Sequence, residues 1–222
     1  MISSVLCKFE DVTNFIPIFP LGIVVYPGED LNLHIFEPRY KQLIAECYEQ
    51  KKSFGIPAVI ENKLQENGTL VQITEITTVH DNGEMDIKTR GTDVFRILEL
   101  IREIPGKLYS GAIVNYPHNH LQGKPELMRK VMTSLRNLLD LLKVNKDFSK
   151  TDDEIRSYDI AHHAGLTIKQ EYELLGLFDE RQRQEYLKRY LAKVIPTVAA
   201  MEQLKEKIKL NGHFKDLPGL EF

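Results

Sequence analysis

The sequence has 222 residues, of which 42% are hydrophobic and 27% are charged, and its formal net charge is −3 at pH 7. These values are typical of a soluble globular protein, and the length allows one large domain or two small ones. The small net charge gives no indication that nucleic acid or an anionic membrane is the partner.

Cysteine usage and hydrophobic segments predict the compartment. Cys7 and Cys47 are far apart and in no spacing known for metal sites, which favours free thiols in a reducing compartment. A disulfide between them stays an open alternative.

No apolar run approaches the roughly 20 residues that span a bilayer, and the first residues lack the basic start and apolar stretch of a signal peptide. We therefore expect a cytoplasmic protein without membrane contacts.

Residues 1–116 are predicted to be mostly β-strand, because short apolar or alternating runs are separated by Pro, Gly and Asn. Asp81-Asn82-Gly83 lies between two such runs and predicts a hairpin, since Asn-Gly readily adopts the positive φ angles of a type I′ turn. The expected strands are Ile16–Pro20, Ile23–Val25, Leu31–Phe36, Phe54–Ile60, Thr69–Val79, Glu84–Arg90, Val94–Ile104 and Leu108–Tyr116.

One helix interrupts these strands. Between Tyr40 and Tyr48 the apolar residues recur at helical spacing and share one face. Pro38 suits the first turn of this helix, where its missing N–H costs nothing.

The second half, residues 117–222, has helical periodicity. An apolar stripe predicts a helix from Pro125 to about Lys143, and a second stripe predicts a long helix from about Glu180 to Leu210 that Pro196 should kink or split. Three capping boxes predict helix starts, at Thr151–Glu154, Thr167–Gln170 and Asp179–Gln182. Residues 211–222 are expected to form a loose tail. The change of period places a domain boundary near residue 117.

Three motifs near the start of the chain resemble a known family. They are Phe15-Ile16-Pro17-Ile18-Phe19-Pro20-Leu21, then Val24-Val25-Tyr26-Pro27-Gly28, then Leu33-His34-Ile35-Phe36-Glu37-Pro38-Arg39-Tyr40. In this order they resemble the opening of the amino-terminal domain of Lon proteases. Weaker matches continue to residue 116, although Val94 replaces an arginine of the family pattern.

The resemblance implies an α+β fold: a β-rich, PUA-like pseudo-barrel with one helix, followed by a carboxy-terminal helical bundle. It also implies a non-catalytic module that binds unfolded or partly folded polypeptides as an adaptor or a holder. A separate protease or chaperone is a further expected partner. No G-x-x-x-x-G-K-[ST] motif occurs, so we expect a stand-alone form without ATPase or peptidase activity and without a cofactor.

The resemblance singles out a candidate set of substrate-binding residues. Glu37 and Arg39 carry charges that a peptide could pair with, and aromatic side chains nearby could stack on it. A structural interpretation is favoured for the same residues: Glu37 caps the following helix, Arg39 pairs locally, and Tyr40 enters the core. The set comprises Tyr26, His34, Phe36, Glu37, Arg39 and Tyr40.

Other functions find little support in the sequence. His118 with His120, and His162 with His163, lack a nearby Cys or carboxylate that would complete a known metal spacing, so no metal site is predicted. No Ser, Lys, His or Asp lies in a recognised nucleophile motif such as G-x-S-x-G, and a Ser–Lys pair that assembles in space stays an open alternative. The alternative function is a PUA-like small-ligand or RNA-binding protein. RNA is disfavoured because residues 1–120 hold 11 Lys and Arg against 16 Asp and Glu, a net charge of −5.

Overall fold

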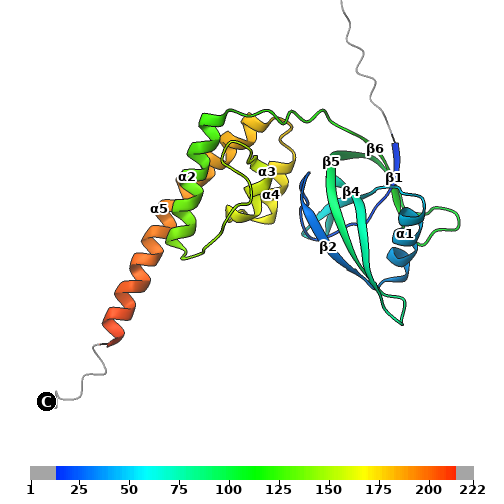
Figure 1. The fold of residues 1–222 in the computed structure, drawn as a ribbon, viewed down its shortest axis with the longest axis horizontal. Coiled ribbons are helices and arrows are strands. Elements are labelled where there is room, and N and C mark those ends of the chain that lie inside the picture. Colours follow the sequence, from blue (N-terminus) through cyan, green and yellow to red (C-terminus); the bar gives the residue numbers. More distant parts are fainter. Residues whose placement is uncertain (1–13, 214–222) are drawn as a thin grey trace, which may run out of the picture. The chain divides into compact units, whose positions relative to one another are not determined.

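The structure is a computed structural model that describes residues 14–213, with side chains for residues 15–209. Cys7 and residues 214–222 lie outside this range, so the expectations for a disulfide and for the end of the tail stay predictions. The described chain is a mixed fold with an antiparallel sheet and helices (Figure 1). It forms two compact units, one with the residues up to His120 and Thr167–Phe178, the other with Leu121–Leu166 and the residues from Asp179 onward.

Six strands form one sheet in the first unit. The strand order is β1-β6-β5-β4-β3, and β2 pairs separately with β5. Two parallel bridges, Ile18 to Gly55 and Leu21 to Ala58, connect the chain after β1 to β3, so the two ends of the strand order are linked. The strands are β1 (Asn14–Pro17), β2 (Asp30–Ile35), β3 (Phe54–Ile60), β4 (Lys63–Val79), β5 (Met85–Ile101) and β6 (Gly111–Asn115).

Two predicted strands, Glu84–Arg90 and Val94–Ile104, form the single long strand β5. Gly91 lies between them, and a Cβ atom there would come within 2.3 Å of the Tyr26 carbonyl oxygen. The Gly91 N–H donates to the Glu29 carbonyl at 2.8 Å. The glycine that suggested a break is therefore a site of close backbone approach inside a strand. The predicted strand Ile23–Val25 is wrong, because this segment, in which Val24 and Val25 are buried and Ile23 is exposed, pairs with no strand.

The turns differ in type from those predicted. The hairpin between β4 and β5 is confirmed, but neither central residue of its turn, Asp81 or Asn82, has a positive φ, so the turn is not type I′. The positive φ of +75° belongs to Gly83, the fourth residue of the turn. A type I′ turn needs positive φ at both central residues. That condition is met by Glu61 and Asn62, with φ angles of 51° and 60°, in the turn between β3 and β4.

Helix α1 (Pro38–Glu49) covers the core of the first unit and confirms the predicted helix. Tyr40, Leu43, Ile44 and Cys47 are buried on its inner face, and the Tyr40 ring lies 3.9 Å from that of Phe19. The expectation that Glu37 caps this helix is wrong, since its side chain makes no capping hydrogen bond.

Helix α4 (Ile168–Leu175) belongs to the first unit, although it follows most of the helical sequence. The capping box predicted at Thr167 and Gln170 is present at its start. The Asn67 N–H donates to the Tyr172 hydroxyl at 3.1 Å, and the Tyr26 hydroxyl donates to the Glu171 carbonyl at 3.0 Å. A boundary near residue 117 does not account for this return of the chain to the sheet.

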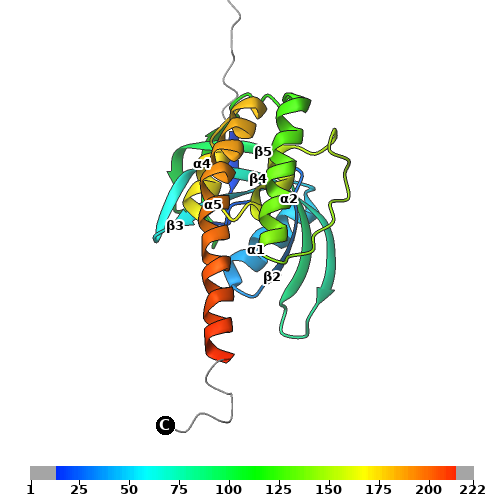
Figure 2. The ribbon, with the colours of Figure 1, turned by 90° about the vertical axis from the view of Figure 1, so that its left-hand side faces the viewer.

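The second unit is built on two helices, α2 (Pro125–Leu141) and α5 (Glu180–His213), with the short α3 (Ser157–Ile160) and a 3₁₀ turn, Ala161–His163. Figures 1 and 2 show α2 and α5 side by side. They run in the same direction: the Lys124 N–H donates to Gln184 Oε1 near their starts, and Lys143 Nζ lies 3.6 Å from Glu206 Oε1 further along. Among the described residues no helix is long and apolar enough to cross a membrane.

One prediction for this unit is wrong, and one of the two effects predicted for Pro196 is excluded. The box at Thr151–Glu154 forms, since the Thr151 N–H and hydroxyl both donate to Glu154 Oε2, but it closes only a turn. Pro196 does not split α5, which is one helix through to His213.

A buried polar cluster holds α3 and α5 together. Glu180 and Arg183 are 1% and 0% exposed, and Arg183 Nε lies 2.8 Å from Glu180 Oε2. Glu180 Oε1 accepts hydrogen bonds from the Ser157 N–H and hydroxyl at 2.8 and 2.9 Å. The Arg183 guanidinium lies 4.2 Å from the Tyr158 ring centroid. Both charges are therefore compensated, as burial requires.

Replacement of Glu180 by Ala should lower the free energy of unfolding by about 3–5 kcal/mol, because it leaves the Arg183 charge buried without its carboxylate. The double variant Glu180→Leu/Arg183→Met should lose less than the single variant. Urea unfolding followed by circular dichroism measures both. Glu185→Ala is the matched control, since its i,i+3 pair with Lys188 is 39% exposed on the same helix and should contribute under about 1 kcal/mol. Equal losses for Glu180 and Glu185 would contradict the expectation.

Glu46 on α1 binds the segment between β5 and β6. Its Oε2 accepts from Lys107 Nζ at 2.7 Å and from the Tyr109 hydroxyl at 2.6 Å. These hydrogen bonds, that from Lys107 first, lower the pKa of the Glu46 carboxyl below its ordinary value of 4.5. The ionised carboxylate is thus favoured in the folded state.

Because the pKa of Glu46 is lower in the folded state, its contribution should be complete above about pH 4.5 and should disappear as the pH falls through the folded pKa. Glu46→Gln should therefore reduce the free energy of unfolding by up to about 1 kcal/mol at pH 7, and the reduction should become smaller as the pH falls below about 4.5. Urea unfolding of both proteins across this range checks it, and a difference independent of pH would rule the assignment out.

Candidate functional site

Two of the six residues singled out from the sequence are buried. Tyr26 is 0% exposed, and its hydroxyl holds helix α4 through the Glu171 carbonyl. Tyr40 is 7% exposed and packs on Phe19, and burial raises the pKa of its hydroxyl. Both side chains support the fold, so in this structure neither is available to a partner in solvent.

The other four residues lie together where β2 passes into α1, and we call them the strand–helix corner: His34, Phe36, Glu37 and Arg39. Phe36 is 58% exposed, and its ring lies 6.2 Å from that of His34. Arg39 Nε donates to Glu37 Oε2 at 2.8 Å, and the guanidinium lies 4.6 Å from the Tyr40 ring centroid. The corner thus presents an apolar ring beside a carboxylate and a guanidinium, on a base fixed by the core.

His34 also takes part in a cluster that the sequence analysis did not anticipate. Its Nδ1 lies 2.8 Å from Asp86 Oδ1, and His80 Nε2 lies 2.7 Å from Asp86 Oδ2. Glu84 Oε2 is 3.3 Å from His34 Nε2. The hydrogen bond to Asp86 raises the pKa of the His34 imidazole, and the bonds from both imidazoles lower the pKa of the Asp86 carboxyl.

Strand register brings this cluster together. His34 on β2 stands directly opposite Asp86 on β5, and His80 follows the end of β4 in the hairpin that leads back to β5. The sequence signal for the cluster was that His80 precedes, and Asp86 follows, the predicted turn Asp81-Asn82-Gly83. The position of β2 beside that hairpin is not a local property of the sequence.

The histidine pairs noted in the sequence lie elsewhere. The rings of His118 and His120 are 4.2 Å apart and edge to face. His163 packs against Phe148 with ring centroids 5.7 Å apart, and burial lowers the pKa of its imidazole. Within residues 14–213, only the grouping of His34, His80 and Asp86 brings three potential metal-ligand residues this close.

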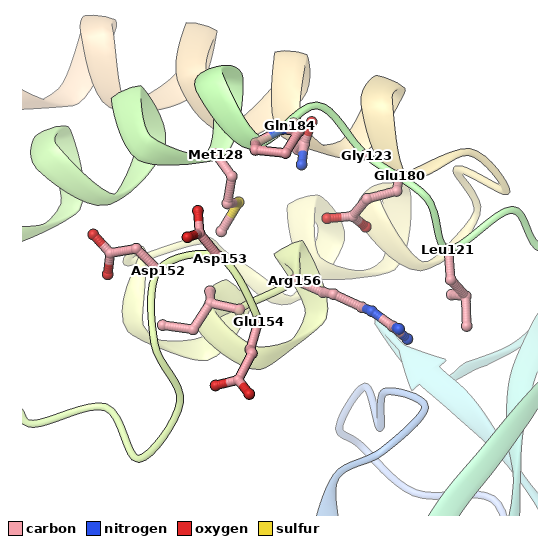
Figure 3. Close-up of a pocket in the computed structure, with 11 residues that line it drawn as sticks. Leu121, Gly123, Met128, Asp152, Asp153, Glu154, Arg156, Glu180 and Gln184 are labelled. Atoms are coloured by element: carbon pink, nitrogen blue, oxygen red, sulfur yellow. The ribbon is translucent and has the colours of Figure 1, made fainter.

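A pocket of about 320 Å³ opens in the second unit (Figure 3). Asp152, Asp153 and Glu154 come from the turn before α3, and Glu180 comes from the start of α5. Its full lining is Leu121, Gly123, Pro125, Met128, Asp152, Asp153, Glu154, Ile155, Arg156, Glu180 and Gln184.

The acidic groups of this pocket have partners within the chain. Asp152 accepts two hydrogen bonds from Arg136, which lower the pKa of the Asp152 carboxyl, and Asp153 pairs with Arg129 at 3.0 Å. A Cβ atom on Gly123 would come within 2.2 Å of Gln184 Nε2, so the start of α2 packs tightly on α5. The pocket wall is therefore part of the helix-packing network. The carboxylates of Asp152, Asp153 and Glu180 pair with arginines of the chain, and that of Glu154 accepts from Thr151.

The sequence and the fold place this chain in a class of substrate-binding domains. The family model for the substrate-binding domain of the ATP-dependent protease La (LON) matches residues 16–193, and the chain belongs to that family. Phe36 and the other corner residues lie inside the matched range.

Solved structures agree with this assignment. The Lon N-terminal domain protein from Xanthomonas campestris is similar, with 26% sequence identity and a TM-score of 0.62, over 78% of this chain and 96% of that one. The N-terminal domain of the Mycobacterium avium complex Lon protease shares the fold, with 15% identity and a TM-score of 0.58, over 81% of this chain and 98% of that one.

The structural role of Tyr26 predicts that Tyr26→Phe lowers the free energy of unfolding by about 1 kcal/mol, because the Glu171 carbonyl loses a donor. Urea unfolding measures the effect. Tyr48→Phe is a matched control, since Tyr48 is 50% exposed and should change stability by less than about 0.5 kcal/mol. An unchanged stability in Tyr26→Phe would show that this hydrogen bond does not hold α4 in place.

Proposed function

We propose that this chain binds unfolded or partly folded polypeptides without cutting them, and acts as an adaptor or a holder. Membership of the Lon substrate-binding family supports polypeptide binding in general. The observation that carries the finer proposal is Phe36, a large apolar side chain that is 58% exposed at the junction of two well-packed elements.

The chemistry of the strand–helix corner suits an unfolded chain. Such a chain exposes apolar side chains, which the Phe36 ring can cover, while Glu37 and Arg39 can pair with charges on either side of them. Side-chain entropy lost on binding is small, because a Phe ring has few rotatable bonds and the corner is held by α1.

Strand β2 offers a second mode of contact. Among the strands of residues 14–213 it pairs with β5 alone. An extended polypeptide can add to such an edge through main-chain hydrogen bonds, which do not depend on its sequence. This mode fits a protein that must accept many different unfolded chains.

The finer architecture is part of the proposal. A PUA-like pseudo-barrel that ends near residue 116 is supported by the link between the two ends of the strand order. A carboxy-terminal bundle is supported by the pairing of α2 with α5. In the proposed role, bound chains pass to a separate protease or chaperone.

Binding is tested by titrating the protein into a fluorescently labelled, permanently unfolded polypeptide without nucleotide. Saturable binding is expected, and the polypeptide should stay intact on a gel. Phe36→Ala should weaken binding about tenfold, the effect of losing roughly 1.4 kcal/mol at a central apolar contact.

Leu98→Ala is the matched control, because Leu98 is 52% exposed on β5, away from the corner, and it should bind as the unaltered protein does. Binding unaffected by Phe36→Ala would move the site away from the corner, and no binding at all would refute the holder role. A labelled single-stranded RNA in the same assay tests the alternative function and should not bind.

A further inference from the structure

We propose that His34, His80 and Asp86 form a binding site for a divalent transition-metal ion, with Zn²⁺ the best match to the ligand set. Imidazole nitrogens and a carboxylate oxygen are the groups that bind Zn²⁺ in proteins, and three protein ligands leave a position for water. One ligand atom from each residue lies within 4.8 Å of the others.

The distances are compatible with an ion after a small adjustment. Zn²⁺ binds nitrogen and oxygen at about 2.0–2.2 Å, so two ligands of one tetrahedral ion stand about 3.3 Å apart. The two imidazole nitrogens are 2.8 and 2.7 Å from the Asp86 oxygens. To bind one ion, each nitrogen–oxygen pair would separate by about half an ångström, and the three ligand atoms, which lie within 4.8 Å of one another, would gather at about 3.3 Å. The side chains of His34, His80 and Asp86 are 51%, 42% and 39% exposed, so rotation about their own bonds is open to them.

The backbone beneath the site is fixed by the sheet. His34 and Asp86 are cross-strand neighbours on β2 and β5. His80 is held by two backbone hydrogen bonds of the hairpin: its N–H donates to the Glu84 carbonyl at 2.8 Å, and its carbonyl accepts from the Gly83 N–H at 2.8 Å. Thr77 Oγ1 donates to the Asp86 carbonyl at 3.0 Å. The three ligands thus sit on paired strands and a closed turn, which keeps the cost of ordering them low.

Glu84 supplies the outer contact that metal-bound histidines usually make. When Nδ1 of His34 binds the ion, Nε2 carries the proton and can donate it to Glu84 Oε2, 3.3 Å away. Such a hydrogen bond fixes the tautomer and the ring orientation, and its loss typically weakens metal binding about 10–100-fold. Glu84 is therefore a positioning residue, which would orient the imidazole of His34.

The simpler alternative is that no metal ion binds, and that the Asp86 carboxylate accepts one hydrogen bond from each of the two imidazoles. Both arrangements use the same side chains, and metal affinity distinguishes them. The proposal does not depend on polypeptide binding, so its test needs no polypeptide and its failure would leave the proposed function untouched.

The test is isothermal titration of Zn²⁺ into the untagged full chain after dialysis against a chelator. One ion per chain is expected in the unaltered protein. His80→Ala and Asp86→Asn should each weaken binding at least about tenfold, and Glu84→Gln about tenfold, because the first two remove a ligand and the third an outer hydrogen bond. Circular dichroism confirms that the exposed substitutions leave the fold intact.

His118→Ala/His120→Ala is the control, because it removes the other close histidine pair and should leave the stoichiometry and affinity unchanged. Co²⁺ should give visible absorption bands in the unaltered protein that His34→Ala/His80→Ala abolishes. No Zn²⁺ binding by the unaltered protein, or undiminished binding by His34→Ala/His80→Ala, would overturn the proposal.

Discussion

The register of strand β5 is the constraint on which the first unit depends. β5 is hydrogen-bonded to β2, β4 and β6, and Gly91 within it makes room for the Tyr26 backbone. Side chains alternate between the two faces of a sheet, so a slip of one residue would turn Ile87 out of the core and Asp86 into it. The same pairing that buries Ile87 places Asp86 opposite His34. Core formation and the exposed cluster therefore follow from one register.

The second unit depends on the ion pair between Glu180 and Arg183, which is buried in its interior, where apolar side chains are usual. Glu180 lies at the start of α5, and its carboxylate joins that helix to α3 through Ser157 and to its own next turn through Arg183. A fully buried ion pair contributes little net stability compared with apolar packing. It does penalise arrangements that leave either charge alone. This favours one relative placement of α3 and α5. The start of α2 is fixed separately, by the close approach of Gly123 to Gln184.

The two proposed sites share His34 but draw on different properties of the sheet. Polypeptide binding would use the exposed Phe36 ring and the main-chain groups along the edge of β2. Metal binding would use His80 and Asp86, which the hairpin between β4 and β5 places beside His34 on β2. An ion bound there would place a charge beside the Phe36 ring, since the His34 and Phe36 rings are 6.2 Å apart. Occupancy of one site would then alter the electrostatic surroundings of the other.

Local patterns in the sequence determined much of this protein. Apolar spacing and Pro38 gave helix α1, the box at Thr167 gave the start of α4, and Asn82-Gly83 gave the hairpin between β4 and β5. The motifs from Phe15 to Tyr40 identified the family. These succeed because helical spacing, capping and turn geometry involve residues only a few positions apart.

Tertiary structure decided the rest, for a physical reason visible in particular residues. Judged from its sequence neighbours, Gly91 predicts a break between two strands. In the structure it lies within the continuous strand β5, where the Tyr26 carbonyl approaches its backbone closely. The box at Thr151 forms its own hydrogen bonds, yet it closes only a turn in the folded chain. The sequence named His34 as a candidate but did not reveal its neighbours, because β2 and β5 meet only when the sheet buries its apolar face. Which residues form elements is largely a local property of this chain; which side chains share a site is fixed by strand register and helix packing.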